Sequence, residues 1–380
     1  MKILINGSYE GGNCPPFYKV LKDLGHSVKV FDIVFYKEVN YSKLINSDDI
    51  ILPSYNYLTY NFIKLLRKLK ISLWMCPFIL EGKKVINNFK PDIILNHQTS
   101  SRANLMLRTN FKPQFNFIYG SEIKGKNINN FMFKEAIETA TLTFAGTEIA
   151  KNRIHNIYPH LTSKVIFRTF NFLFIDQFLE NEKKRNSLYD RKIMGYKDDD
   201  FIIYDNRTLR HMETTLHLLK AVRNLNEDGK NIKIILCKGF SGLDNIVYEA
   251  QKIVLNYKME SYISIIDKEL SNEEHYRNIN ISNAISSIIP YDEFGSFIMQ
   301  GMYFMKYLLL SGLPQYKEIF GENAVYINEN NYLNIYKSIN YILDRKNKIN
   351  LNKNYDILFN NYNSKTNVLE LLNVIQQYQD

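Results

Sequence analysis

The chain has 380 residues, enough for two domains of ordinary size, and 45% of them are hydrophobic, which excludes a disordered protein. Its three cysteines, Cys14, Cys76 and Cys237, form no C-x-x-C pair, so we expect neither a disulfide framework nor a zinc ribbon. The formal net charge of +9 suits either an anionic partner or a lysine-rich surface. No basic block is dense enough to predict nucleic-acid binding.

The sequence shows no apolar segment typical of a signal peptide and no run long enough for a transmembrane helix. We therefore expect a cytoplasmic protein. One amphipathic segment, residues 62–70, alternates apolar side chains with Lys64, Arg67, Lys68 and Lys70. Such a helix suits peripheral contact with an anionic membrane, although an ordinary helix that faces a core has the same pattern.

Strand-like and helix-like segments alternate along the first half of the chain. We expect strands at 2–6, 27–31, 49–52, 71–74, 91–95, 115–119 and 142–145. A helix is expected at 17–24, and another near Glu148 behind Thr147 as its N-cap. The pattern loosens and charges accumulate from 164 to 197, which we interpret as the connection between two domains.

The alternation resumes in the second half. We expect strands at 201–204, 233–237, 263–266, 284–289, 307–310 and 324–327. We expect helices at 214–225, 244–257 and 272–278, and mostly helical structure from 332 to 380. This order predicts βαβ units and a parallel sheet in each half. Because ligands of such sheets bind outside the carboxyl ends of the strands, we expect the loops there to face a shared central cleft.

One segment, residues 290–302, places an acid, a glycine turn and a new helix directly after an apolar run. The backbone N–H groups of Ser296 and Phe297, which follow Gly295, would form an anion site at the start of that helix. Polar groups just before and just inside that helix, such as Asp292 and Gln300, could also bind the hydroxyls of a sugar ring. These features together suggest an enzyme that handles a nucleotide sugar.

The order of the segments resembles that of GT-B glycosyltransferases, and the C-terminal half is similar to glycosyltransferase family 4. That family carries Glu-Gly-Phe-Gly and a second Glu eight positions after the first, where this chain has Asp292-Glu293-Phe294-Gly295 and Gln300. The resemblance implies an α/β fold of two Rossmann-like domains facing a central cleft. It implies an acceptor domain at 1–175, on which a helix at about 362–380 packs back, and a donor domain at 176–361.

The resemblance also implies roles for the acids of the motif. Asp292 takes the place of the acid near the hydroxyls of the donor sugar, and Gln300 that of the acid that binds the ribose. Glu293 stands where the family has glycine, so either Asp292 or Glu293 would face the sugar.

By the same resemblance, Arg207 matches the arginine that binds the leaving diphosphate. The partner lysine of the family is missing here, and Arg210, His211 or Lys238 could supply its charge. Asp198-Asp199-Asp200 resembles a metal-binding D-x-D, but its place before a strand favours a solvated turn.

In the N-terminal half, His97 ends a predicted strand at the expected cleft face, where it could bind a sugar or act as a base. Gly11 and Gly12 would let the backbone approach the donor phosphates, or they form a flexible acceptor loop. Tyr119 stands where the family often has a histidine, and Glu122 could bind acceptor hydroxyls.

We therefore predict a metal-independent, retaining glycosyltransferase without a cofactor, which moves a sugar from a nucleoside-diphosphate sugar to a glycan, lipid-linked or other hydroxyl acceptor. The residues expected in catalysis are Arg207, Asp292 and His97. Two alternatives remain on the same fold: a nucleotide-sugar epimerase, and a non-catalytic relative that binds a sugar or nucleotide.

Overall fold

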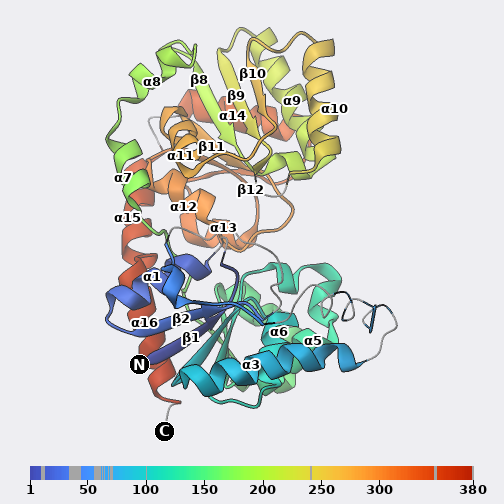
Figure 1. Ribbon diagram of the computed structural model, residues 1–380. Helices are drawn as coiled ribbons and strands as arrows, with labels where there is room; N and C mark the ends of the chain where they lie inside the picture. The colour runs from blue at the N-terminus through green and yellow to red at the C-terminus, as the bar shows by residue number, and fades with distance from the viewer. Residues whose placement is uncertain are drawn as a thin grey trace. The chain divides into compact units, whose positions relative to one another are not determined.

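The computed structural model describes residues 1–9, 13–33, 44–54, 61, 63, 65, 66, 68, 72–99, 101–239, 242–345 and 349–378. The chain divides into two compact units (Figure 1). Unit 1 comprises Met1–Phe172 with Ser364–Asp380, and unit 2 comprises Leu173–Asn363. The boundaries proposed from the sequence, at 175/176 and 361/362, lie close to these.

Unit 1 is built on a parallel sheet in the order β3-β2-β1-β4-β5-β6-β7. Its strands are β1 Lys2–Asn6, β2 Ser27–Phe31, β3 Ile50–Ile51, β4 Ile93–His97, β5 Gln114–Ile118, β6 Leu142–Ala145 and β7 Val165–Phe167. Its helices include α1 Cys14–Asp23, α3 Cys76–Phe89, α4 Ser101–Leu107, α5 Phe131–Thr139, α6 Glu148–Ile157 and α16 Ser364–Gln376. The helix α16, from the end of the chain, contacts α1.

Two expectations for unit 1 are wrong. The strand expected at 71–74 does not form over its described residues; Ser72–Met75 is a 3-10 turn that leads into α3. The apolar run continues beyond Met75 at helical spacing, and Phe78, Gly82 and Val85 bury one face of α3. In the segment interpreted as a connection, Val165 begins a further strand, β7, which pairs in parallel with β6.

Unit 2 is a second parallel sheet, in the order β10-β9-β8-β11-β12-β13. Its strands are β8 Phe201–Asp205, β9 Ile232–Cys237, β10 Ile263–Ile266, β11 Ala284–Ser287, β12 Tyr307–Ser311 and β13 Val325–Ile327. Its helices are α7 Gln177–Lys184, α8 Ser187–Ile193, α9 Met212–Glu227, α10 Asp244–Asn256, α11 Asn272–Ile281, α12 Ser296–Tyr303, α13 Pro314–Phe320, α14 Tyr332–Arg345 and α15 Leu351–Asn361.

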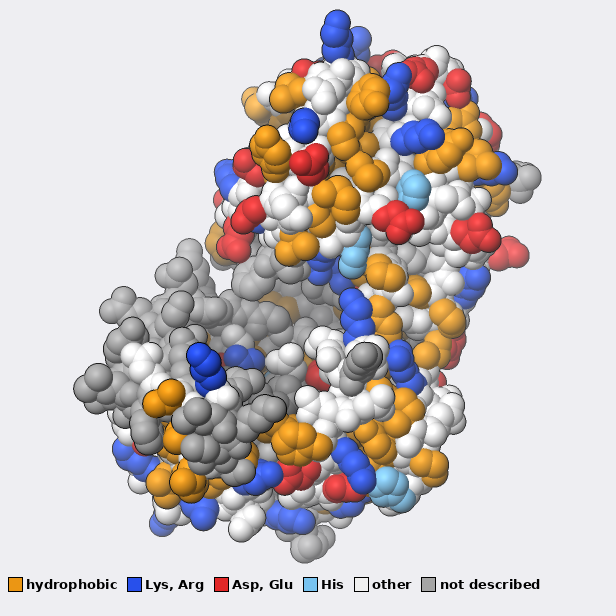
Figure 2. All heavy atoms as spheres, turned by 90° about the vertical axis from the view of Figure 1, so that its right-hand side faces the viewer, with side chains coloured by type: hydrophobic (Ala, Val, Ile, Leu, Met, Phe, Trp, Pro, Cys, Tyr) orange, Lys and Arg blue, Asp and Glu red, His pale blue; other side chains and the backbone are white. Residues whose placement is uncertain are grey.

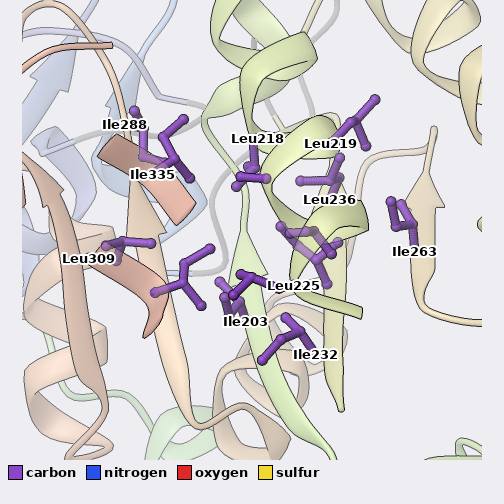
Figure 3. Packing of buried hydrophobic residues seen from close by; sticks show 14 of the residues in the cluster. Ile203, Leu218, Leu219, Leu225, Ile232, Leu236, Ile263, Ile288, Leu309 and Ile335 are labelled. Carbon is purple, nitrogen blue, oxygen red and sulfur yellow. The ribbon is translucent and has the colours of Figure 1, made fainter. Parts of the chain in front are cut away.

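Successive side chains of each central strand in unit 2 enter different cores, as the two-residue period of a strand requires. Ile203 packs on one face of the sheet with residues of α9 and α14, such as Leu218 and Ile335 (Figure 3). Its neighbour Tyr204 packs on the other face with residues of α11 and α12. Tyr204 is thereby directed toward α11 and α12.

Side-chain acceptors organise the start of helix α6 and the turn before strand β8. Thr147 Oγ1 accepts a hydrogen bond from the N–H of Ala150 at 3.0 Å, so the predicted N-cap of α6 is confirmed. In the Asp198–Asp200 turn, Asp198 and Asp199 are exposed, in line with the expected solvated turn, whereas Asp200 is only 4% exposed and accepts from the N–H of Lys197. Within the described ranges, no helix is both long and apolar enough to cross a membrane.

Candidate functional site

The sheet order of unit 2 creates a topological switch point between β8 and β11. The chain runs from β8 outward to β9 and β10, and then returns to the other side of β8 as β11. The loops after β8 and β11 therefore leave the sheet in opposite directions and open a crevice at its carboxyl edge. The first loop carries Arg207, and the second, residues 288–295, leads into α12.

The loop after β8 is held by Asp205, whose side chain is 1% exposed. Its Oδ1 accepts from the N–H groups of Arg207 at 2.8 Å and Thr208 at 2.7 Å, and its Oδ2 accepts from the hydroxyls of Thr208 and Ser286. The sequence analysis missed Asp205. An aspartate at a strand end, two residues before a turn, is a recognisable signal for this kind of capping.

Arg207 forms an ion pair with Asp292 across the crevice, with 3.1 Å between Nη2 and Oδ1. The two side chains are 16% and 10% exposed, so the pair is largely removed from water. The Nε of Arg207 is buried and has no hydrogen-bond partner among the described residues. A Cβ on Gly295 would lie 2.6 Å from Nη1 of Arg207, so a larger residue here would displace the end of the Arg207 side chain from its present position.

Asp292 organises the turn before α12. Its carboxylate also accepts from the Tyr316 hydroxyl at 2.5 Å and from the N–H of Gly295 at 3.3 Å, while its carbonyl accepts from the side chain of Gln315. The neighbouring acid Glu293 is 6% exposed and accepts from the Tyr291 hydroxyl at 2.6 Å. Of the two acids, Asp292 is the one that faces Arg207.

The turn contains a backbone conformation unusual for a bulky residue. Phe294 has φ +66°, in the left-handed region, although its side chain is 2% exposed. Its ring packs against Tyr362 and Phe320, with centroid separations of 4.6 and 5.7 Å. Tertiary packing therefore holds a strained turn next to Asp292 and Gly295, and such strain is typical of functional loops.

The start of α12 leaves backbone donors available. Gly295 is the N-cap and provides no side-chain cap, so the first N–H groups, at Ser296 and Phe297, are not taken up by a capping group. Ser296 is exposed. The ring of Phe297 is buried against Tyr204 and His275, so Phe297 can contribute only its backbone to a site.

Two of the residues expected to supply a further charge near Arg207 have different surroundings in the structure. Arg210 has a buried Nε with no partner among the described residues, and burial followed by the nearby charge of Arg207 lowers its pKa. Lys238 instead pairs with Asp244, with 2.5 Å between Nζ and Oδ1, and this hydrogen bond raises its pKa. Arg210 thus shares the environment of Arg207, whereas the charge of Lys238 is compensated after β9.

Gln300 lies on the second turn of α12, where its Oε1 is 2.9 Å from Nε2 of His275. The other ring nitrogen of His275, Nδ1, is 2.8 Å from the hydroxyl of Tyr204. Burial lowers the pKa of His275. The sequence analysis did not identify His275, because its partners are 71 and 25 residues away along the chain.

In unit 1, His97 ends β4 beside β1, at the corresponding switch point. The side chain is 4% exposed, packs against the rings of Phe17 and Phe117, and has its Nδ1 2.7 Å from the Tyr119 hydroxyl. Burial lowers its pKa to about 3, so the ring is neutral. Its Nε2 is buried without a partner among the described residues. Gly11 and Gly12 lie outside the described residues.

A chain of amide side chains connects the strand ends of unit 1. Asn6 on β1 donates to Asn96 on β4 at 2.8 Å, and Asn96 donates to Asn116 on β5 at 3.0 Å. All three are 0% exposed. Glu122, in the next loop, is also buried and accepts from the N–H groups of Thr99 and Tyr119, so its carboxylate supports the loops.

No protein-family model matches the chain, and no curated protein matches it. Solved structures match over nearly the whole length. A glycosyltransferase from Rickettsia africae ESF-5 is 16% identical, with a TM-score of 0.72 and coverage of 99% of this chain and 98% of that one. Anabaena Alr3699/HepE in complex with UDP and glucose is 13% identical, with a TM-score of 0.74 and coverage of 99% and 100%. Sucrose-phosphate synthase from Thermosynechococcus elongatus is 14% identical, with a TM-score of 0.74 and coverage of 99% and 98%.

At these identities the likeness shows the fold. The chain has the two-domain, Rossmann-like α/β architecture of these structures, so the predicted GT-B fold class is confirmed. The closer resemblance to family 4 stays a prediction.

The neutral state of His97 predicts a pH-dependent stability of unit 1. The unfolded chain binds a proton near pH 6.5 and the folded chain only near pH 3, so stability is complete above pH 6.5 and falls as the pH drops toward 3. The loss approaches about 1.4 kcal/mol per pH unit in that window. His97→Asn keeps an acceptor for Tyr119 but has no imidazole to protonate. Its free energy of unfolding should therefore decrease less steeply between pH 6.5 and 4.5, by up to about 1.4 kcal/mol per pH unit.

Urea unfolding followed by fluorescence measures this difference, because the single tryptophan, Trp74, lies in unit 1. His160→Asn, at a side chain that is 54% exposed, is the matched control and should leave the pH slope unchanged. Equal slopes in His97→Asn and the unsubstituted protein would contradict a neutral, buried His97.

Proposed function

We propose that the protein is a glycosyltransferase that takes a sugar from a nucleoside-diphosphate sugar, with unit 2 holding the donor. The observation that carries the proposal is the guanidinium of Arg207 against the Gly295 turn, at the switch point between β8 and β11. A fixed cation beside the open N-terminus of α12 is the arrangement that a diphosphate requires.

The proposed chemistry is electrostatic. Cleavage of the sugar–phosphate bond places negative charge on the departing diphosphate. Arg207, Arg210 and the N–H groups of Ser296 and Phe297 would stabilise that charge, because they are positioned before the reaction begins. Asp292 accepts from Nη2 of Arg207, and the other terminal N–H groups of the two guanidinium groups are the donors that we propose for the diphosphate. We extend the proposal to a retaining, metal-independent transfer without a cofactor, in line with the resemblance to family 4.

The structural neighbours support a nucleotide-sugar donor. HepE has been crystallised with UDP-glucose and with UDP and glucose, and its fold covers this chain almost completely. UDP is therefore the first nucleotide to test. Asp292, held beside Arg207, is the acid that we place near the sugar, and Glu293 is engaged by Tyr291.

We propose that unit 1 binds the acceptor, a glycan, lipid-linked or other hydroxyl compound. The buried, neutral state of His97 suits a residue that positions Tyr119 and the loop after β4. Gly11 and Gly12 remain proposed contacts of the loop after β1.

Nucleotide sugars incubated with and without candidate acceptors distinguish transfer from its alternatives. Diphosphate release that depends on acceptor supports transfer, an epimerised donor supports an epimerase, and binding without turnover supports a non-catalytic relative.

Arg207→Ala should weaken UDP binding by about 10- to 100-fold, the value of charge-assisted hydrogen bonds, measured by calorimetry. Arg207→Lys should recover part of the loss, since it restores charge but not the planar fork. Unchanged UDP affinity in Arg207→Ala would remove the diphosphate assignment.

The role of the α12 backbone can be tested by removing one N–H. Ser296→Pro deletes the donor at the first helical position, where proline is well tolerated, and the ψ of 158° at Gly295 suits a residue before proline. UDP affinity should fall about three- to tenfold with little change in melting temperature. Ser296→Ala keeps the N–H and should bind UDP normally; an equal loss in both variants would argue against the backbone contact.

Peripheral contact of unit 1 with an anionic membrane is a further part of the proposal. The basic segment 62–70 lies largely outside the described residues. Leu73 and Leu80, which follow it in the sequence, are 63% and 65% exposed, and the exposed Lys84 shares a helix face with Leu80. Leu80→Glu should reduce cosedimentation with anionic vesicles several-fold, whereas Leu216→Glu in unit 2 should not. Equal sedimentation of all three proteins, or none, would exclude this contact.

A further inference from the structure

A chain of hydrogen bonds joins three elements of unit 2 behind the proposed diphosphate site. Tyr204 on β8 contacts His275 on α11, and His275 contacts Gln300 on α12, at 2.8 and 2.9 Å. Tyr204 is 0% exposed. The ring of Phe297 packs against both Tyr204 and His275, with centroid separations of 5.6 and 5.8 Å, so the imidazole cannot turn without losing packing.

The start of α11 determines where His275 lies. Ser271 Oγ accepts from the N–H of Glu274 at 3.2 Å, and the Glu274 carboxylate accepts from the N–H of Ser271 at 2.9 Å. This capping box defines the first turn of the helix. His275 follows directly, on a backbone that is already fixed.

Donors and acceptors follow one direction along the chain of hydrogen bonds. The Oε1 of Gln300 can only accept, so the hydrogen lies on Nε2 of His275, and Nδ1 accepts from the Tyr204 hydroxyl. Both contacts are satisfied by the neutral ring. Because Oε1 of Gln300 faces His275, the amide nitrogen Nε2 of Gln300 points away from His275. This nitrogen donates to no described residue.

We propose that His275 is a positioning residue that determines the orientation of the Gln300 side-chain amide in the nucleotide-sugar site. It holds Gln300 so that the site offers an N–H donor to a hydroxyl oxygen of the ribose next to the diphosphate. Gln300 lies four residues after Ser296, on the same helix face and about one turn, ~5.4 Å, from the N–H groups proposed to bind phosphate. This inference rests on the proposed function and names a determinant of its specificity.

The test compares the tightest binder among UDP, ADP and GDP with its 2′-deoxy and 3′-deoxy forms by calorimetry. At least one deoxy form should bind the unsubstituted protein about three- to tenfold more weakly, the value of one hydrogen bond. His275→Gln can place an amide nitrogen near the former Nε2 and should retain this ratio. His275→Asn reaches only the position of Nδ1, and its ratio should fall toward one while inorganic pyrophosphate binds as before.

The ratio separates positioning from a merely structural role, which would lower the melting temperature of both variants without changing the preference for ribose. The inference is overturned by an unchanged ratio in His275→Asn or by a ratio of one in the unsubstituted protein. In either case, nucleotide binding that depends on Arg207 would leave the proposed function standing. Failure of the unsubstituted protein to bind any of the three nucleotides overturns the proposed function itself.

Discussion

The ion pair of Arg207 and Asp292 joins two loops that are 85 residues apart in the sequence, and the candidate site is arranged around it. Asp205 holds the first loop, Tyr316 and Gln315 hold the second, and Gly295 leaves the space that the guanidinium occupies. A largely buried pair of this kind contributes little net stability, because desolvation of the two charges offsets their attraction. Its consequence is preorganisation: the guanidinium is held in place before an anion arrives.

Both units have a parallel sheet with a topological switch point, but the side chains at the two switch points differ in their chemistry. Between β8 and β11 the described side chains include two arginines with unused donors. Between β1 and β4 they are mainly buried amides and a neutral histidine, beside the ion pair of Arg102 and Asp32. Arginines suit an anionic donor, and buried amides with a neutral histidine suit hydroxyl groups. This difference agrees with the proposed division between a donor unit and an acceptor unit.

Much of the architecture could be predicted, because apolar periodicity and capping are local properties. Strand β4, strand β9 and the Thr147 cap of α6 follow from a few adjacent residues. The prediction of a strand at 71–74 was wrong because short apolar runs occur in both strands and helices. Strand β7 was missed because three residues carry too little periodicity, and its pairing with β6 is a tertiary contact.

For the site, the sequence alone determined the residue types: a guanidinium after one strand, an acid and a glycine after another, and a new helix behind them. Only the tertiary structure decided which of them meet. It placed Arg210 with Arg207, joined Lys238 to Asp244, directed Asp292 rather than Glu293 at the guanidinium, and connected Gln300 to His275. Such partnerships depend on side-chain direction and on loops brought together by the sheet order, and neither is encoded in the spacing of residues along the chain.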